Sequence, residues 1–375
     1  MRIPHVKIID STLREGEQTP GVVFTDEARR RIIAGLYLVG IDEIELGIAT
    51  PLNRWLPDLV TEARKLTKGA CHLSLWCRCL KEDIAFAASC RPDLLSLSIP
   101  VSDIHIRERL RKNKDWVKKN LARSIRQAKS LNIPSISVGL EDASKADINF
   151  ILDVAKTAKQ HGAERIRLAD TVGTCSPGTM QQLVLAVKKS SNINIGVHCH
   201  NDFGMATANS IAALEAGASS LDATVLGLGE RAGNCRLEEV TGYLALVLHQ
   251  SQYRTQALPE LCRYVADVTN KEIADNHPLV GAEIFTCESG LHQHGLTVNP
   301  SMYEPYEPAH VGGQRQLRFG HKIGRKAVRL YLEKLGVRLN EMQIKHITDR
   351  IRTGGKILSE GQLLRFAAKE SRSQP

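Results

Sequence analysis

Short apolar runs rich in β-branched residues recur along the first part of the chain. Runs of this length, bounded by polar and turn-forming residues, are typical of buried β-strands. The pattern therefore predicts eight strands, spaced about 20 to 45 residues apart. They cover residues 6–13, 41–48, 72–77, 94–101, 135–140, 165–172, 193–200 and 221–227.

Most segments between these runs show helical periodicity, and residues 25–39 are the clearest case. Thr25 can cap this helix, the acidic pair that follows it suits the positive N-terminal end, and Gly40 ends it. Eight strand and helix alternations over about 245 residues match the size of a (β/α)8 TIM barrel of the α/β class. Similar helical segments lie at 55–66, 115–130, 146–161, 177–189 and 206–216.

Residues that could carry chemistry follow several separate strands. Arg14 and Glu15 follow the first run, Thr171 lies at the end of the sixth, and His198 and His200 close the seventh. A doubly wound open sheet, the alternative fold, would concentrate its site at one switch point. A barrel instead collects the carboxyl ends of all its strands at one mouth. The distribution therefore favours the barrel.

The strand and helix rhythm changes after about residue 262. Residues 277–308 are rich in Gly, Pro, His and Glu, which predicts an extended linker, whereas 322–335 and 340–353 predict two helices. From Glu370 the tail is polar, and we expect it to fray. The expected parts are a TIM-barrel catalytic domain at 1–262, a linker subdomain at 263–310 and a helical C-terminal subdomain at 311–375.

Composition favours a soluble cytoplasmic protein. Nine cysteines, an odd number, fit a reducing compartment, and we expect most of them to be small buried residues. No run of 18 apolar residues occurs, and the first residues lack the apolar stretch of a secretory signal. We therefore expect no membrane association.

The formal net charge of +9 raises the question of nucleic acid. The densest basic stretch, at 107–119, is interrupted by Glu108 and Asp115, and no aromatic series interleaves with it. A solvated helix face explains this stretch at least as well. We therefore expect an anionic small substrate and no nucleic acid.

His198 and His200 are two residues apart at a predicted strand end, so both imidazoles would leave the same face of the strand. Two imidazoles suit a divalent first-row ion, but histidines bonded to the backbone or to water fit the same pattern. Glu15 adds an oxygen ligand, and Arg14 adds a fixed positive charge that could stabilise an oxyanion. The alternative for both is that they are surface charges after a strand.

A glycine-rich segment, residues 227–234, follows the eighth strand. Glycine lets the backbone approach a ligand closely, and Asn234 could offer a carbonyl oxygen to a metal or a donor to substrate. Glycine turns after strands are common, so this segment alone is weak support for a site.

Four motifs in this order, DSTLREGEQ, ADTVG, HCHNDFG and GLGERAGN, resemble the signatures of the acyl-CoA Claisen-condensing enzymes. That family includes isopropylmalate, citramalate and homocitrate synthases, and hydroxymethylglutaryl-CoA lyase is a relative. The resemblance runs from residue 8 to about residue 335. It implies a TIM barrel, a linker subdomain, and helices that cover the mouth of the partner's barrel in a homodimer.

The resemblance also implies substrates and metal ligands. The substrates would be a 2-oxo acid and acetyl-CoA, with one divalent metal ion that the sequence leaves open between Zn, Mn and Mg. The implied metal ligands are Glu15, His198 and His200, with Asn234 beside or among them.

Further roles follow from the same resemblance. Arg14 would contact the keto oxygen, while Gln18 and Thr171 would contact substrate. His292, at the end of the sequence FTCESGLH, matches the catalytic histidine of the family, and Tyr303 matches a tyrosine that assists it. Without the resemblance, His292 would be interpreted as a linker histidine with no role.

Within the family, residues 76–79, 96–103 and 139–147 most resemble the homocitrate synthases of nitrogen fixation. Those enzymes form (R)-homocitrate from acetyl-CoA and 2-oxoglutarate for the iron-molybdenum cofactor. Lysine-pathway homocitrate synthases carry Arg-Phe-Ser where this chain has residues 137–139, and that arginine binds the distal carboxylate. Arg78 and His72 are the candidate replacements on the third strand.

Other members stay open as alternatives. Citramalate, isopropylmalate and re-face citrate synthases use other 2-oxo acids, and a small difference in substrate length leaves little trace in sequence. A cleaving lyase would need a cysteine-bearing loop at the mouth, but Cys235 comes one place after Asn234 rather than before it. A silent barrel that binds an anionic metabolite is disfavoured, because every expected ligand position holds a competent residue.

Overall fold

The structure is a computed structural model that describes residues 6–372. The chain divides into two compact units, Met1–Glu272 and Ile273–Pro375. The expected boundary at 262 lies within helix α9 (Leu258–Thr269), whose apolar face is buried, so the first unit continues to Glu272. The second unit contains the remaining part of the expected linker together with the helical subdomain.

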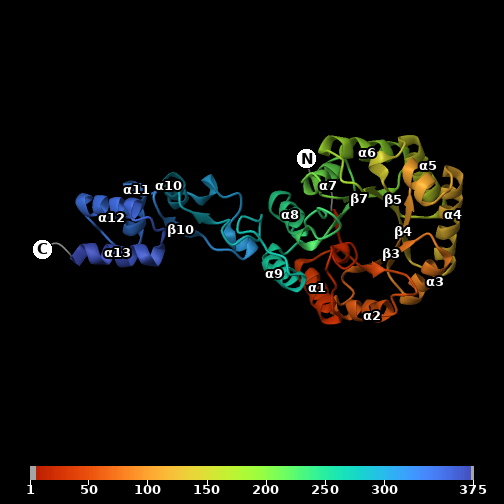
Figure 1. The fold of residues 1–375 in the computed structure, drawn as a ribbon, viewed down its shortest axis with the longest axis horizontal. Helices are drawn as coiled ribbons and strands as arrows, with labels where there is room; N and C mark the ends of the chain where they lie inside the picture. The colour runs from red at the N-terminus through yellow and green to blue at the C-terminus, as the bar shows by residue number, and fades with distance from the viewer. Residues whose placement is uncertain (1–5, 373–375) are drawn as a thin grey trace. The chain divides into compact units, whose positions relative to one another are not determined.

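The first unit contains a closed barrel of eight parallel strands in sequential order, and β1 pairs with β8. The predicted TIM barrel is therefore confirmed. In Figure 1 the strands form the inner ring and helices α1 to α7 lie outside them. The strands are β1 (Lys7–Asp10), β2 (Glu43–Ile48), β3 (His72–Arg78), β4 (Leu94–Pro100), β5 (Ser135–Glu141), β6 (Arg165–Asp170), β7 (Asn194–Cys199) and β8 (Ser220–Ala223).

Helices follow the strands, and α1 (Asp26–Val39) forms as its sequence predicts. The hydroxyl of Thr25 accepts a hydrogen bond from the backbone N–H of Ala28, and Gly40 ends the helix with a positive φ of 91°. Helix α3 (Lys81–Cys90) was not predicted, because its buried positions include Asp83 and small residues rather than a clear apolar stripe. The remaining helices of this unit are α2 (Leu56–Leu66), α3 (Lys81–Cys90), α4 (Lys114–Ser130), α5 (Ile148–His161), α6 (Pro177–Ser190), α7 (Ala206–Glu215) and α8 (Leu237–Gly242).

The barrel interior contains a layer of paired charges. Arg165 on β6 donates to both carboxylate oxygens of Glu43 on β2, at 2.9 Å each. Arg167 lies two residues further along β6, nearer the carboxyl end of the barrel. Its Nη1 donates to Glu45 at 3.1 Å and to Asp222 at 2.8 Å. All five side chains are buried, so each charge depends on its partner for stability.

The second unit packs helices around a small sheet with strand order β11, β10, β9. Its core includes Phe319, Val328, Leu332 and Ile347, all fully buried. The strands are β9 (Thr286–Cys287), β10 (Gln316–Phe319) and β11 (Leu358–Ser359), and the helices are α10 (Gly290–Val298), α11 (Arg325–Lys334), α12 (Glu341–Thr353) and α13 (Glu360–Arg372).

The two helices predicted in this unit are confirmed as α11 and α12. The expectation of an extended linker at 277–308 is wrong for part of this segment, because helix α10 forms within it. A frayed tail from Glu370 is also wrong as far as the structure describes it. Glu370 lies in α13 and pairs with His346 and Arg350, while residues 373–375 of that tail lie outside the described residues.

Eight of the nine cysteines are buried, as expected, and Cys287 is half-buried. None of the helices in the described part of the chain has both the length and the apolar character that crossing a bilayer requires.

Candidate metal centre and substrate cavity

The turn after β1 places Arg14 and Glu15 at the carboxyl end of the barrel. The carbonyl oxygen of Ser11 accepts the backbone N–H groups of Arg14, Glu15 and Gly16 at 3.1, 2.7 and 3.2 Å. This tight turn fixes the two side chains beside each other, and both are buried. The Arg14 guanidinium contacts the Glu15 carboxylate directly.

His198 and His200 leave the same face at the end of β7, with ring centroids 4.9 Å apart and nearly perpendicular planes. Nδ1 of His198 lies 3.0 Å from Oδ2 of Asp222, and Nδ1 of His200 lies 3.2 Å from the carbonyl oxygen of Asp170. A ring nitrogen that faces an oxygen acceptor carries the proton, so Nε2 of His198 keeps its lone pair, whereas both ring nitrogens of His200 face oxygen atoms.

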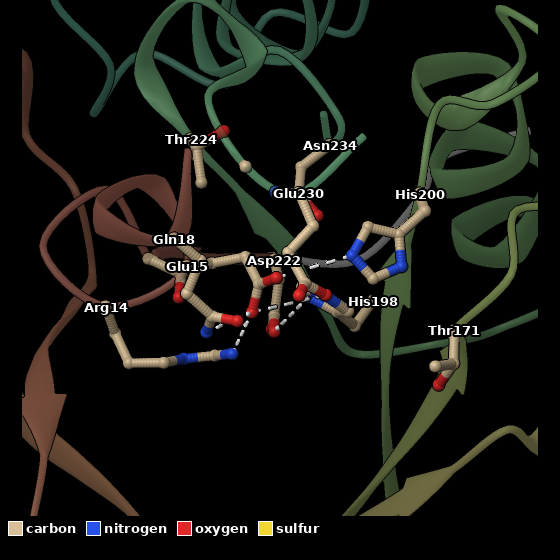
Figure 2. Close-up of polar contacts among 12 residues, drawn as sticks. Arg14, Glu15, Gln18, Thr171, His198, His200, Asp222, Thr224, Glu230 and Asn234 are labelled. Atoms are coloured by element: carbon tan, nitrogen blue, oxygen red, sulfur yellow. Dashed lines mark hydrogen bonds and ion pairs between the residues drawn. The ribbon is translucent and has the colours of Figure 1, made fainter. Parts of the chain in front are cut away.

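Both Nε2 atoms lie close to Glu15, at 4.0 Å from Oε2 for His198 and 3.4 Å from Oε1 for His200. One ligand atom from each of these three buried residues lies within 4.8 Å of the other two. Figure 2 shows the carboxylate and the imidazoles converging from the first and seventh strands. The sequence prediction that these strands share one mouth is confirmed.

The protonation states also suit a cation. Burial opposes ionisation of Glu15, but the Arg14 guanidinium and the hydrogen bond with His200 outweigh it and hold the pKa of this carboxyl well below its ordinary range. Burial lowers the pKa of His198, against the influence of Asp222, and so favours the neutral ring. An ionised carboxylate and neutral imidazoles are the forms that bind metal ions.

Asn234 adds a fourth candidate ligand atom, an amide oxygen, to this region. Its Nδ2 donates to the carbonyl of Leu228 at 2.8 Å, and its buried Oδ1 has no hydrogen-bond partner among the described residues. A Cβ at Gly229 would lie 2.0 Å from Asn234 Nδ2, so glycine is required for this close packing. A buried carbonyl oxygen without a donor fits a metal ligand, so the residues present suit a divalent ion.

A cavity of about 330 Å³ opens beside the three candidate ligands. Arg14, Gln18 and Thr171 line it, as the resemblance implies for substrate contacts. The hydroxyl of Thr171 accepts from the backbone N–H of Asp142 at 2.8 Å, which leaves its own proton for another acceptor. Gln18 is exposed, and its Nε2 lies 3.4 Å from Oε2 of Glu15.

His292 and Tyr303 belong to the second unit. Their rings lie side by side, with centroids 4.4 Å apart and planes at 39°. Both side chains are exposed. The described contacts therefore join these two residues to each other.

The two suggested replacements for the distal-carboxylate arginine do not fit. His72 is the first residue of β3 and lines a cavity at the opposite end of the barrel, with Lys7 and Glu43. Arg78 closes β3, but its guanidinium donates to Asp83 at 2.7 and 3.1 Å and does not line the cavity beside Glu15.

Sequence reasoning missed three residues that organise the site. Glu45 accepts from Arg14 Nε at 2.6 Å, Asp222 orients His198, and Arg167 pairs with both carboxylates. A signal was present, since charged residues alternate with apolar ones inside β2 and β6. Charges at alternate positions of a barrel strand face the interior.

The comparisons with known proteins agree with this geometry. A family model described as HMGL-like matches residues 5–265. The chain belongs to the HMGL-like family. A second model, described as homocitrate synthase post-HMGL domain-like, matches residues 279–357 of this HMGL-like protein.

The HMGL-like chain has several named relatives of similar identity. It is 38% identical over 348 residues to 2-isopropylmalate synthase 2 of Caldanaerobacter subterraneus subsp. tengcongensis, covering 92% of this chain and 90% of the relative. It is 38% identical over 332 residues to homocitrate synthase of Frankia alni, covering 88% and 94%. It is 35% identical over 365 residues to (R)-citramalate synthase of Methanocaldococcus jannaschii, covering 96% and 73%. The resemblance to the Claisen-condensing synthases is confirmed, and these three relatives are all named as synthases.

Solved structures support the fold alone. HMG-CoA lyase of Bacillus subtilis aligns with a TM-score of 0.65 at 18% identity, covering 73% of this HMGL-like chain and 97% of the lyase. The lyase of Pseudomonas aeruginosa aligns with a TM-score of 0.62 at 20% identity, covering 72% and 96%.

Proposed function

We propose that this protein is a homocitrate synthase that condenses acetyl-CoA with 2-oxoglutarate and releases (R)-homocitrate and CoA. The observation that carries the proposal is the buried cluster of Glu15, His198 and His200 beside Arg14 in one cavity. A divalent ion bound there would act as a Lewis acid toward the 2-oxo group of the acceptor. Asn234 would complete the ligand set through Oδ1.

Arg14 supplies the fixed positive charge of this site. Its Nε is held by Glu45 at 2.6 Å and its Nη1 by Glu15, so the guanidinium cannot rotate away. As the methyl carbon of acetyl-CoA attacks the ketone, negative charge develops on the keto oxygen beside Arg14. Preorganised donors of this kind stabilise the transition state more than the ground state.

The base that removes the methyl proton is proposed to be His292, with Tyr303 beside it. Their paired rings and their exposure are consistent with a group that is presented to another surface. By the resemblance, a homodimer would bring these residues to the partner's barrel. Hydrolysis of the condensed thioester then consumes one water, releases CoA as the free thiol, and leaves the third carboxylate of the product, in addition to the two that 2-oxoglutarate supplies.

The choice of 2-oxoglutarate is supported by the cationic lining of the cavity and by relatives. Arg109 and Arg167 line the cavity in addition to Arg14. Homocitrate synthases of Frankia alni and Nostoc sp. are each 38% identical to this chain. Supply of homocitrate for the nitrogenase cofactor is the physiological role that we propose.

A lyase with the same metal site is less well supported. Cys235, the cysteine nearest the glycine-rich loop, is fully buried, and this burial raises the pKa of its thiol to about 12. A buried neutral thiol cannot serve as the acid or base of a cleavage reaction at the mouth.

The proposal is tested by removing metal from the purified protein, restoring Mn²⁺, Mg²⁺ or Zn²⁺, and following CoA release with a thiol reagent. We expect CoA release from acetyl-CoA with 2-oxoglutarate, dependent on added metal. Release with pyruvate or 2-oxoisovalerate but not with 2-oxoglutarate would overturn the assignment and identify a citramalate or isopropylmalate synthase.

A further inference from the structure

Arg167 lines the substrate cavity, and one edge of its guanidinium, formed by Nε and Nη2, makes no hydrogen bond to a described residue. Only its Nη1 is occupied within the described chain, by Glu45 at 3.1 Å and Asp222 at 2.8 Å. Nε and Nη2 donate to no described residue, although both lie on one edge of the planar guanidinium. That edge is the one that holds a carboxylate through two parallel hydrogen bonds.

The edge faces Gly139, which pairs with Arg167 across β5 and β6. A Cβ at position 139 would lie 3.8 Å from both Nε and Nη2, and Gly139 and Arg167 line the same cavity as Glu15. The missing side chain therefore leaves room in front of the two nitrogens. We propose that Arg167 binds the distal carboxylate of the acceptor in this space, an inference that rests on the proposed use of a 2-oxo dicarboxylate.

The partners of Arg167 suit it to this role. Glu45 and Asp222 hold the guanidinium from the side opposite the open edge and stabilise its charge inside the barrel. The same two carboxylates hold Arg14 and orient His198. The protein groups that would bind the two ends of the acceptor therefore share the same carboxylate partners, which fix their separation. A rigid arrangement of this kind discriminates between acceptors of different length.

Two other cations are weaker candidates. Arg109 lines the cavity, but its Nη2 contacts Glu141 and half of its side chain is exposed. Position 137, where the lysine-pathway enzymes carry their arginine, is occupied by Ser137. Its hydroxyl accepts from Arg165 Nε at 3.1 Å and does not line the cavity.

Two acceptors of equal carbon number test the assignment on the metal-loaded enzyme. 2-Oxoglutarate has the distal carboxylate, and 2-oxopentanoate has a methyl group in its place. Arg167→Lys keeps the charge near Glu45 and Asp222 but cannot donate from two parallel N–H groups. We expect it to raise KM for 2-oxoglutarate about 10- to 100-fold, the usual effect of losing a charged hydrogen bond, and to change kcat/KM for 2-oxopentanoate little.

Arg165→Lys is the matched control, because Arg165 is on the same strand but bonds Glu43 at the other end of the barrel. It should preserve the preference for 2-oxoglutarate. Gly139→Ala tests the same idea with Arg167 intact, since its Cβ would make only ordinary contacts with Ser98 and Arg167. We expect this variant to fold normally and to lose affinity for 2-oxoglutarate selectively.

Each outcome separates this inference from the proposed function. If the wild type uses 2-oxoglutarate and both variants keep its selectivity, Arg167 is not the distal partner, and a selective loss in Arg109→Ala would assign that role to Arg109. If the wild type prefers another 2-oxo dicarboxylate, such as oxaloacetate, and the variants lose that preference, the inference about Arg167 stands while the homocitrate assignment fails. A wild type that uses only monocarboxylates would overturn both.

Discussion

Nδ1 of His198 lies 3.0 Å from Oδ2 of Asp222, and both groups are buried. This hydrogen bond fixes the tautomer of the imidazole and directs its Nε2 toward Glu15. Carboxylates that accept from the second nitrogen of a ligating histidine also raise its basicity. We therefore expect Asp222 to contribute to metal affinity without contacting the ion. The same oxygen accepts from Arg167.

Replacing Asp222 with Asn should weaken metal binding about 10- to 100-fold, because the amide can turn its NH2 group toward His198 and disturb the tautomer. Competition with a fluorescent chelator measures this affinity. Asp83→Asn is the control, since Asp83 is a buried carboxylate that pairs with Arg78 away from the site. Equal metal affinities in the two variants would show that Asp222 has no such role.

His200→Ala should abolish metal retention and turnover, because the remaining ligands offer one imidazole and one carboxylate. Elemental analysis after gel filtration gives the number of ions per chain. His72→Ala, at the other end of the barrel, should retain the wild-type stoichiometry. One tightly bound ion in the His200 variant would mean that the metal lies elsewhere.

Glu45→Gln should destabilise the barrel by about 3 kcal/mol at neutral pH. Burial opposes the charge of Glu45, but Arg14 and Arg167 outweigh it and lower the pKa from 4.5 to about 2. A carboxyl group whose pKa is lowered by folding stabilises the fold above pH 4.5. This stabilisation is lost as the pH falls toward 2. The difference in the free energy of unfolding between wild type and variant, measured by urea unfolding, should therefore shrink as the pH is lowered from 7 to 3.

The control for this prediction is Glu62→Gln, because Glu62 forms an exposed pair with Arg30. It should change the free energy of unfolding by less than about 0.5 kcal/mol. A Glu45 variant as stable as this control at pH 7 would contradict the argument from buried pairing.

Phe319→Ala should destabilise the second unit by about 3 to 5 kcal/mol. Phe319 is fully buried on β10, and its ring packs on Tyr331 with centroids 5.0 Å apart. Limited proteolysis of the full chain, with the cuts mapped by mass spectrometry, should show new cleavage within 273–372 but not within the barrel. Met342→Ala is the control, because the Met342 side chain is 71% exposed, and this variant should be cleaved at the same sites as the wild type.

The barrel could be predicted because its evidence is local and repeated. Each buried parallel strand is a short apolar run, and Thr25 and Gly40 delimit α1 by capping alone. The sheet of the second unit was harder to predict from sequence, because β9 has only two residues and pairs with β10, which lies far along the chain. Long-range pairing of such short strands leaves no periodic signal in sequence.

The metal ligands were predicted from residue type and position, but their supporting residues were not. Glu45 and Asp222 are charged residues between apolar ones in β2 and β8, and both pair with Arg167 on β6. Which charge pairs with which depends on strand order and register, and sequence spacing does not give these. The same limit explains why His72 was wrongly placed among the distal-carboxylate candidates.

The central claim is that this site joins acetyl-CoA to 2-oxoglutarate, and a one-pot competition tests it most directly. Metal-loaded enzyme is given acetyl-CoA labelled with carbon-13 in its methyl group, together with equal concentrations of 2-oxoglutarate, oxaloacetate, pyruvate and 2-oxoisovalerate. Mass spectrometry of the labelled products gives the ratio of kcat/KM values. The account predicts that labelled homocitrate predominates; a predominance of citrate, citramalate or isopropylmalate, or the absence of any labelled condensation product, would contradict it.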